Sequence, residues 1–249
     1  MDNSLLVSLS HQLAAYRAMD VIANNIANAS TPGFKREAAK FEEFITMMRP
    51  AEGQTGPQSV SFVKDAGVMR DTGQGNIEQT GAPYDVAIAG PGFFAVQTPV
   101  GTRYTRDGHF SLDANGNLVT SQGYQVQGDG GTIAITPNDG DISIAPDGTI
   151  SSVVHGVGNQ LAKLKVVDFA NTAALVKQGA NLYSTGQTPT TPANINLRQG
   201  ALEASNVQPV IEISHMIEVM RAYEATSSLS KSQEDMLRQA IDKLGQMPS

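Results

Sequence analysis

Four histidines, His11, His109, His155 and His215, are the side chains of this chain that most often bind metals in proteins. A zinc site built from paired histidines needs them about three to five residues apart, and no pair here has that spacing. The 249-residue chain also has no cysteine, which excludes thiolate metal sites, thiol nucleophiles and disulfides. We therefore predict no metal site and expect each histidine to be a surface or packing residue.

The acidic segment that begins at Asp113 starts like a calcium-binding loop. Leu118, however, stands where such a loop needs glycine, and Tyr124 stands where it needs a bidentate glutamate. The segment contains Asn115-Gly116, which is a strong signal for a tight hairpin turn. We predict a hairpin here rather than an ion site.

Other motifs of catalysis are also missing. The chain has no G-x-S-x-G elbow, and Gly73-Gln-Gly75 lacks the strand-glycine-helix context of a phosphate-binding loop. Arg103 and Arg106 lie beside Asp107 in a strand-turn setting, which we interpret as a solvated ion pair. The sequence thus predicts no catalytic residue and no cofactor.

Three asparagines stand out instead in "VIANNIANASTPGFKR", residues 21–36. At 100° per residue, Asn24, Asn25 and Asn28 share one side of a predicted helix that Thr31-Pro32-Gly33 ends. Each asparagine costs a helix roughly half a kcal/mol relative to alanine. We hypothesise that these amides bond to neighbouring helices and fix their register; the alternative is that they merely cap and solubilise a helix end.

The helix that carries these asparagines is predicted from the start of the chain. Its apolar residues follow steps of three and four, close to a coiled-coil seam. They are Leu6, Leu9, Leu13, Tyr16, Met19, Ala23 and Ile26.

A second long helix is predicted from about residue 207 to 244. Asn206 is the expected N-cap, with Pro209 in the first turn. Its apolar positions are Val210, Ile213, Ile217, Met220, Tyr223, Leu229, Leu237, Ile241 and Leu244. Both segments could be ordinary amphipathic helices on a globular core, but their apolar seams are thin, so we expect them to be more stable among copies of themselves.

The middle of the chain, residues 81–183, has short alternating runs separated by turn pairs. Hairpins are predicted at Asn115-Gly116 and Asp147-Gly148, one strand at 160–170, and a short helix or turn after it. This spacing is typical of an antiparallel sandwich or irregular barrel.

Helical and strand patterns are segregated, which predicts an α+β fold. We expect a discontinuous, coiled-coil-like helical domain from residues 1–36 and 201–249, with a mainly antiparallel β domain inserted at 81–183. The strips 37–80 and 184–200 are expected as extended linkers or a lone β-hairpin.

Composition limits the class of partner. The formal charge of −7 argues against nucleic acid, and no apolar run reaches the roughly 20 residues that span a bilayer. The N-terminus lacks the features of a secretory signal peptide. The chain is therefore expected to stay in the cytoplasm or to leave by a route that cleaves nothing.

Three stretches together resemble the axial family of bacterial flagellar rod and hook proteins. The family's A-N-N-[IL]-A-N motif, with its Pro-Gly break, aromatic and basic residue, matches residues 23–35. Its S-N-V and acidic-Arg-Ala-Tyr-Glu patterns are similar to residues 205–207 and 220–224, where Met220 departs from the pattern. Residues 81–128 look like the family's β domain.

The resemblance implies a structural, non-enzymatic rod subunit of the periplasm-spanning basal body, exported without cleavage by the flagellar type III apparatus. Implied partners are copies of itself and other rod proteins (FlgB, FlgC and FlgG types), with no cofactor, nucleic acid or membrane insertion. Expected assembly residues are Leu9, Leu13, Tyr16, Ile22, Asn24, Asn25, Ile26, Asn28, Pro32, Gly33, Phe34, Asn206, Ile213, Ile217, Met220, Arg221 and Tyr223.

Two alternatives stay open. The start of the chain and its Ser-Thr-Pro-Gly break are more like the proximal-rod branch, and the distal-rod branch is the alternative. A remoter possibility is a secreted carbohydrate-binding β module. It would need exposed aromatic residues from the set Tyr84, Phe93, Phe94, Tyr104, Phe110 and Tyr124.

Overall fold

The computed structural model describes residues 3–48, 58–136, 139–154, 157–192 and 194–245, and divides into two compact units. Unit 1 comprises 1–27, 37–71 and 208–249; unit 2 comprises 28–36 and 72–207. The structure confirms an α+β protein with a helix at each end and a mainly antiparallel β region.

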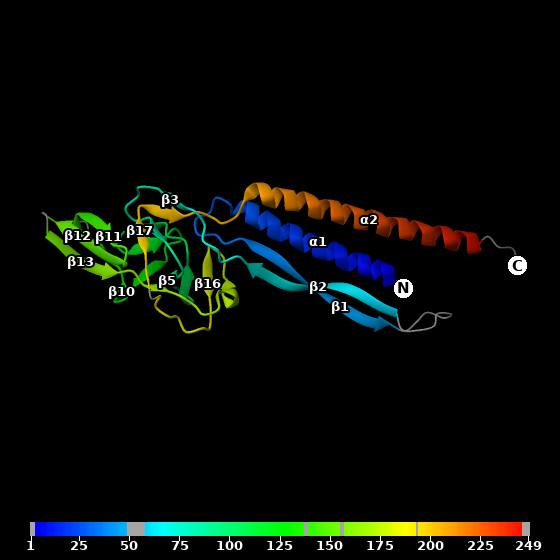
Figure 1. The fold of residues 1–249 in the computed structure, drawn as a ribbon, viewed down its shortest axis with the longest axis horizontal. Coiled ribbons are helices and arrows are strands. Elements are labelled where there is room, and N and C mark those ends of the chain that lie inside the picture. The colour runs from blue at the N-terminus through cyan, green and yellow to red at the C-terminus, as the bar shows by residue number, and fades with distance from the viewer. Residues whose placement is uncertain (1–2, 49–57, 137–138, 155–156, 193, 246–249) are drawn as a thin grey trace. The chain divides into compact units, whose positions relative to one another are not determined.

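Unit 1 is built from two helices and one hairpin. Its elements are α1 (Asn3–Ala27), β1 (Glu37–Met48), β2 (Gln58–Arg70) and α2 (Pro209–Gly245). β1 and β2 pair antiparallel from Glu37↔Arg70 to Met48↔Gln58, with an irregularity after Ala39. α1 lies between this hairpin and α2, and the two helices run antiparallel (Figure 1).

The start of α2 corrects one prediction. Asn206 is not its N-cap, because the helix begins at Pro209 and the carbonyl of Gln208 accepts from Ile211 N (3.0 Å) and Glu212 N (3.1 Å). The side chain of Asn206 is used within unit 2 instead. Its Oδ1 accepts from Arg36 N at 2.7 Å, and its Nδ2 donates to the carbonyl of Gly73 at 3.1 Å.

Unit 2 is a β structure in which all pairs between the described strands are antiparallel. A nine-stranded sheet has the order β15-β16-β6-β5-β9-β8-β7, with β10 paired to β9 and β14 to β5; smaller sheets are β11-β12-β13, β17-β4 and β18-β3. The bounds are β3 Ile77–Gln79, β4 Val86–Ile88, β5 Phe93–Thr98, β6 Gly101–Thr105, β7 Phe110–Leu112, β8 Leu118–Thr120, β9 Gln125–Gly128, β10 Gly131–Thr132, β11 Asp141–Ile144, β12 Thr149–Val154, β13 Val157–Lys163, β14 Val166–Val167, β15 Val176–Lys177, β16 Leu182–Ser184, β17 Leu197–Gln199 and β18 Ala201–Glu203.

Both predicted hairpins are confirmed: β7 pairs with β8 across Asn115-Gly116, and β11 pairs with β12 across Asp147-Gly148. The single strand predicted at 160–170 is wrong. It divides into β13 and β14 because Leu164 N donates to Gly148 O and Lys165 N donates to Gln127 O, so the ladder changes partners. The next segment contains a 3₁₀ turn, η2 (Thr172–Ala174), capped by Asn171.

Unit 2 has an apolar core of its own. Phe94 lies edge-on to Phe110, their ring centroids 5.1 Å apart, and aliphatic residues such as Ile150, Leu118 and Val126 surround them. A second cluster joins Phe93, Phe169 and Tyr183. This buried core supplies the apolar burial that stabilises unit 2.

Candidate assembly site

Asn25, near the C-terminal end of α1, is a buried polar residue of unit 1. Its side chain is 0% exposed, its Oδ1 accepts from Glu37 N at 3.0 Å, and its Nδ2 donates to Glu37 O at 2.7 Å. The same Nδ2 donates to the buried carboxylate of Glu212 at 3.0 Å. One amide therefore connects α1 to the first residue of β1 and to the first turn of α2.

The other two asparagines are placed differently. Asn24 is exposed on α1, and Asn28 belongs to unit 2, where its Oδ1 accepts from the Thr31 hydroxyl at 3.3 Å. The expected stripe of three amides is therefore spread over three environments. The interhelical bond of our hypothesis exists for Asn25, between helices of the same chain.

The large apolar residues of α1 divide into two sets. Leu9, Leu13 and Tyr16 are between 51% and 63% exposed. Ile22 and Ile26 are half-buried near Asn25 along the helix. The expected assembly residues of the first half of α1 thus lie on its free surface.

Helix α2 also has an exposed apolar row. Ile213, Ile217 and Met220 are each about half exposed, Arg221 is exposed and Tyr223 is half-buried. Removing apolar surface from water is favourable by about 25 cal/mol for each Å², so a partner that covers these rows would be bound more tightly.

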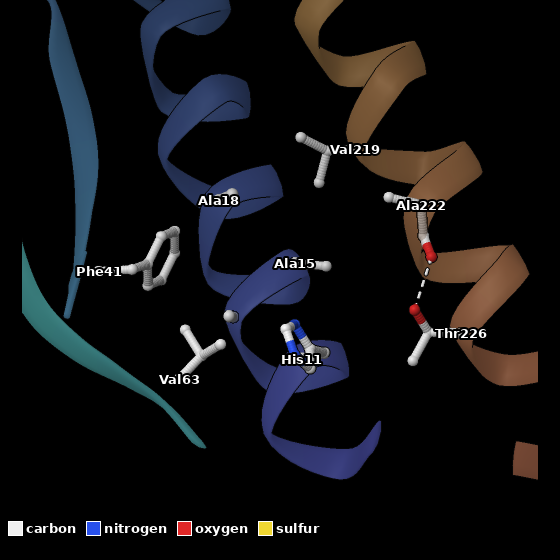
Figure 2. A pocket seen from close by; sticks show the side chains of 9 residues that line it. His11, Ala15, Ala18, Phe41, Val63, Val219, Ala222 and Thr226 are labelled. Carbon is white, nitrogen blue, oxygen red and sulfur yellow. Dashed lines mark hydrogen bonds between the residues drawn. The ribbon is translucent and has the colours of Figure 1, made fainter. Parts of the chain in front are cut away.

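On another face of unit 1, small residues form an apolar groove of about 350 Å³, which we call the alanine groove (Figure 2). Ala14, Ala15 and Ala18 of α1, with His11, form its floor. Phe41 and Val63 of the hairpin stand on one side, and Val219, Ala222 and Thr226 of α2 stand on the other.

The Pro-Gly break after α1 is part of unit 2. Pro32 O accepts from Asn181 Nδ2 at 3.1 Å, and Gly33 N donates to Glu203 O at 2.7 Å. Gly33 has a φ of +67°, and a Cβ there would come within 2.5 Å of the Arg106 carbonyl carbon. Phe34 is buried, and Lys177 Nζ lies 4.4 Å from its ring centre. Residues 32–34 are therefore fixed by contacts within the β structure.

A buried ionic cluster next to this break was missed by sequence reasoning. Lys35, Glu203 and Arg106 have exposed fractions of 1% to 5%. Glu203 Oε1 lies 2.5 Å from Lys35 Nζ and accepts from Gly75 N at 2.9 Å, and Glu203 Oε2 lies 3.2 Å from Arg106 Nε. A single carboxylate thus pairs with two cations from segments distant in sequence.

Our interpretation of Arg106 as part of a solvated ion pair with Asp107 is wrong, because Arg106 is buried and has other partners. Its guanidinium donates to the carbonyls of Gly90 and Gly92, each at 2.8 Å, and pairs with Glu203. Burial lowers the pKa of Arg106, and the charge of Glu203 opposes that shift. Asp107 accepts from His109 N at 2.9 Å, and burial raises the pKa of its carboxyl.

No part of the described chain gathers three or more metal-ligating side chains. His11 lines the alanine groove, His109 Nδ1 lies 2.8 Å from Asp85 Oδ1, His215 lies in α2, and His155 is outside the described residues. A carbohydrate-binding module would need exposed aromatic rings, but Phe93, Phe94 and Phe110 are buried. Neither helix offers an apolar stretch long enough to cross a bilayer within the described residues.

Three family models match the chain in sequence order. Residues 5–35 match the model described as flagella basal body rod protein, and residues 87–152 match the flagellar hook protein FlgE/F/G D1 domain. Residues 198–243 match the flagellar basal body rod FlgEFG protein C-terminal model. These matches include Asn25, the Pro-Gly break, Arg106 and Glu203.

Relatives are similar over nearly the whole length. The flagellar basal-body rod protein FlgF of Caulobacter vibrioides is 42% identical over 99% of this chain and 100% of its own length. FlgF of Mesorhizobium japonicum is 35% identical over 98% of this chain and 99% of its own. FlgG of Buchnera aphidicola subsp. Acyrthosiphon pisum is 38% identical over 94% and 97%, respectively.

Proposed function

This chain belongs to the flagellar basal-body rod proteins, and from that premise we propose that it is a structural, non-enzymatic subunit that polymerises through its terminal helices. The FlgF branch is favoured over the FlgG branch by the higher identity over more of the chain. Copies of this chain and other rod proteins, of the FlgB, FlgC and FlgG types, are the proposed partners.

One observation carries the proposal: unit 2 buries most of its large apolar side chains in a core, whereas α1 and α2 each leave a row of them in solvent. Leu13 is 63% exposed, and Ile217 is 47% exposed. A helix that buries only a thin seam is marginal in water, so its free apolar row favours association. Coiled-coil-like contacts between terminal helices of neighbouring subunits would cover both rows.

The rest of the assignment follows from this role. We propose that the terminal helices within residues 1–36 and 201–249 carry assembly and that 81–183 acts as the β domain. Of the strips 37–80 and 184–200, the first supplies the β1-β2 hairpin that packs on α1. Export through the flagellar type III channel would deliver the chain to a rod that crosses the periplasm. Helices that gain their order from neighbours suit a chain that travels before it folds completely.

The test is a charge placed in each exposed row. Leu13→Asp and Ile217→Asp should abolish rod growth and swimming in cells that lack the native protein, because a carboxylate in an apolar interface is costly to desolvate. Rods are counted in isolated basal bodies by electron microscopy.

The matched control is Ala225→Asp, which replaces another exposed α2 residue about 80° around the helix from Ile217, outside the apolar row. It should leave rods and swimming unchanged. Normal rods with both Leu13→Asp and Ile217→Asp would refute polymerisation through the helices.

A further inference from the structure

Helix α1 carries a row of large apolar side chains on one face, which we call the α1 ridge. It consists of Leu6, Leu9, Leu13 and Tyr16, which are 41% to 63% exposed. Their steps of three and four residues keep them in line along the helix. The ridge therefore presents one continuous apolar edge to solvent.

The opposite face of α1 is built from small residues. At 100° per residue, Ala14, Ala15 and Ala18 point about half a turn away from the ridge. They form the floor of the alanine groove, which the hairpin and α2 flank (Figure 2). The same helix thus carries large side chains on one side and a hollow on the other.

The chemistry of the groove favours aliphatic side chains over a polar small molecule. His11 and Thr226 are the polar side chains among its lining residues, and the Thr226 hydroxyl already donates to the carbonyl of Ala222 at 2.9 Å. Small-molecule sites need several convergent polar groups to fix a ligand. Alanine floors, by contrast, let another helix approach closely, and its large side chains fill the space.

We propose that the α1 ridge of one copy lies in the alanine groove of a second copy. The inference deepens the proposed function and rests on it, because it assigns the two surfaces through which copies meet. Ridge and groove are different patches on opposite faces, so the contact is heterologous and leaves a free ridge at one end and a free groove at the other. Successive copies can then join head to tail.

The area of the contact agrees with a polymer rather than a dimer. Four half-exposed apolar side chains offer roughly 300 Å². With an equal contribution from the groove, the pair buries about half of the 1,200 Å² that a stable two-protein interface needs. A second copy held by one such contact would dissociate readily, whereas a subunit with contacts on both faces would stay.

Engineered cysteines test the contact, since the chain has none of its own. Leu13→Cys with Ala18→Cys places one thiol on the ridge and one in the groove. Within a chain the two residues are separated by about 7.5 Å of helix rise, beyond the roughly 7 Å reach of a disulfide between Cα atoms. Basal bodies from cells that express the double variant are oxidised with copper-phenanthroline and separated by non-reducing electrophoresis.

The expected result is a ladder of dimers, trimers and higher species for the double variant, and no species above a dimer for either single variant. Rods that form and support swimming but give no ladder would overturn the ridge-in-groove contact while leaving the proposed function intact. Absence of rods in cells with the wild-type chain would overturn both.

A filled groove gives an independent test if the cysteine variants assemble poorly. Ala222→Leu inserts a side chain into the groove from an exposed position, so unit 1 can still fold. Ala225→Leu makes the same change at an exposed α2 residue outside the groove. Ala222→Leu should raise the critical concentration for polymerisation at least tenfold in light scattering, and Ala225→Leu should leave it unchanged. Equal critical concentrations for both variants would also overturn the contact.

Discussion

Asn25 occupies a position where the neighbouring groups require an amide. Glu37 presents a backbone N–H that needs an acceptor and a carbonyl that needs a donor, and the Glu212 carboxylate needs a second donor. Asparagine supplies both kinds of group within one planar side chain. Aspartate could accept but not donate, and leucine could do neither.

Asn25→Leu should lower the free energy of unfolding of unit 1 by about 2–4 kcal/mol, because three buried polar groups lose a partner. Hydrogen exchange of α1 and α2 amides measures the loss. Asn24→Ala, at an exposed position on the same helix, should change it by less than about 1 kcal/mol. Equal effects of the two variants would mean that the Asn25 bonds contribute little.

A comparable prediction for unit 2 concerns Glu203. Glu203→Gln leaves the buried Lys35 and Arg106 charges without their anion, which should destabilise unit 2 by about 3–5 kcal/mol in denaturant unfolding. The control is Glu78→Gln on β3, the strand that pairs with β18, where the side chain is exposed. A loss below about 1 kcal/mol for Glu203→Gln would mean that the cluster tolerates its net positive charge.

These two sites differ in how visible they are in the sequence. Asn25 could be singled out because asparagine is unusual inside a helix, although its partners could not. Lys35 and Glu203 are 168 residues apart, and Arg106 stands next to an acidic residue that is not its partner. Nothing local to these residues indicates the pairing, since only the tertiary fold brings the three segments together.

The secondary structure was predicted where period and turn chemistry act locally. Steps of three and four gave both helices, and Asn115-Gly116 gave its hairpin. The N-cap of α2 was misplaced because Asn206 has the right residue type but its oxygen is taken by Arg36 N. The split between β13 and β14 was missed because it depends on partner strands and not on the segment itself.

The turn that follows α1 gives an element-scale prediction. Gly33→Ala should destabilise unit 2 by at least about 3 kcal/mol, because a positive φ and a Cβ overlap with the Arg106 backbone act together. Gly81→Ala has a similar φ of +76° with open space around it, so about 1–2 kcal/mol is expected. Thermal unfolding compares the two variants, and equal losses would show that Gly33 is chosen for its φ alone.

We expect the backbone amides of the two units to differ in their protection from hydrogen exchange. Amides of unit 2 that lie in its buried sheets should exchange slowly in the monomer, and those of α1 should exchange faster because its apolar row lacks a partner. The boundary between fast-exchanging and slow-exchanging amides should fall after Ala27, where unit 2 begins, rather than after Arg36. Gly33 N, bonded to Glu203 O at 2.7 Å, should be protected with unit 2.

Exchange mass spectrometry with short peptides over residues 20–40 resolves this boundary. Slow exchange throughout α1 in the monomer would contradict the proposal that the helices gain their order from other subunits. Fast exchange at Gly33 and Phe34 would contradict their assignment to unit 2.

Most of unit 2 is one continuous segment, residues 72–207, and its entry and exit are tied together by Asn206 Nδ2 to Gly73 O and by Ala204 N to Asn76 O. A module whose two chain crossings touch can be enlarged, trimmed or exchanged for another domain with adjacent ends without altering the distance that the flanking segments must span. Evolution and protein engineers can thus vary the bulk of such a subunit while the pieces before and after it keep their spacing.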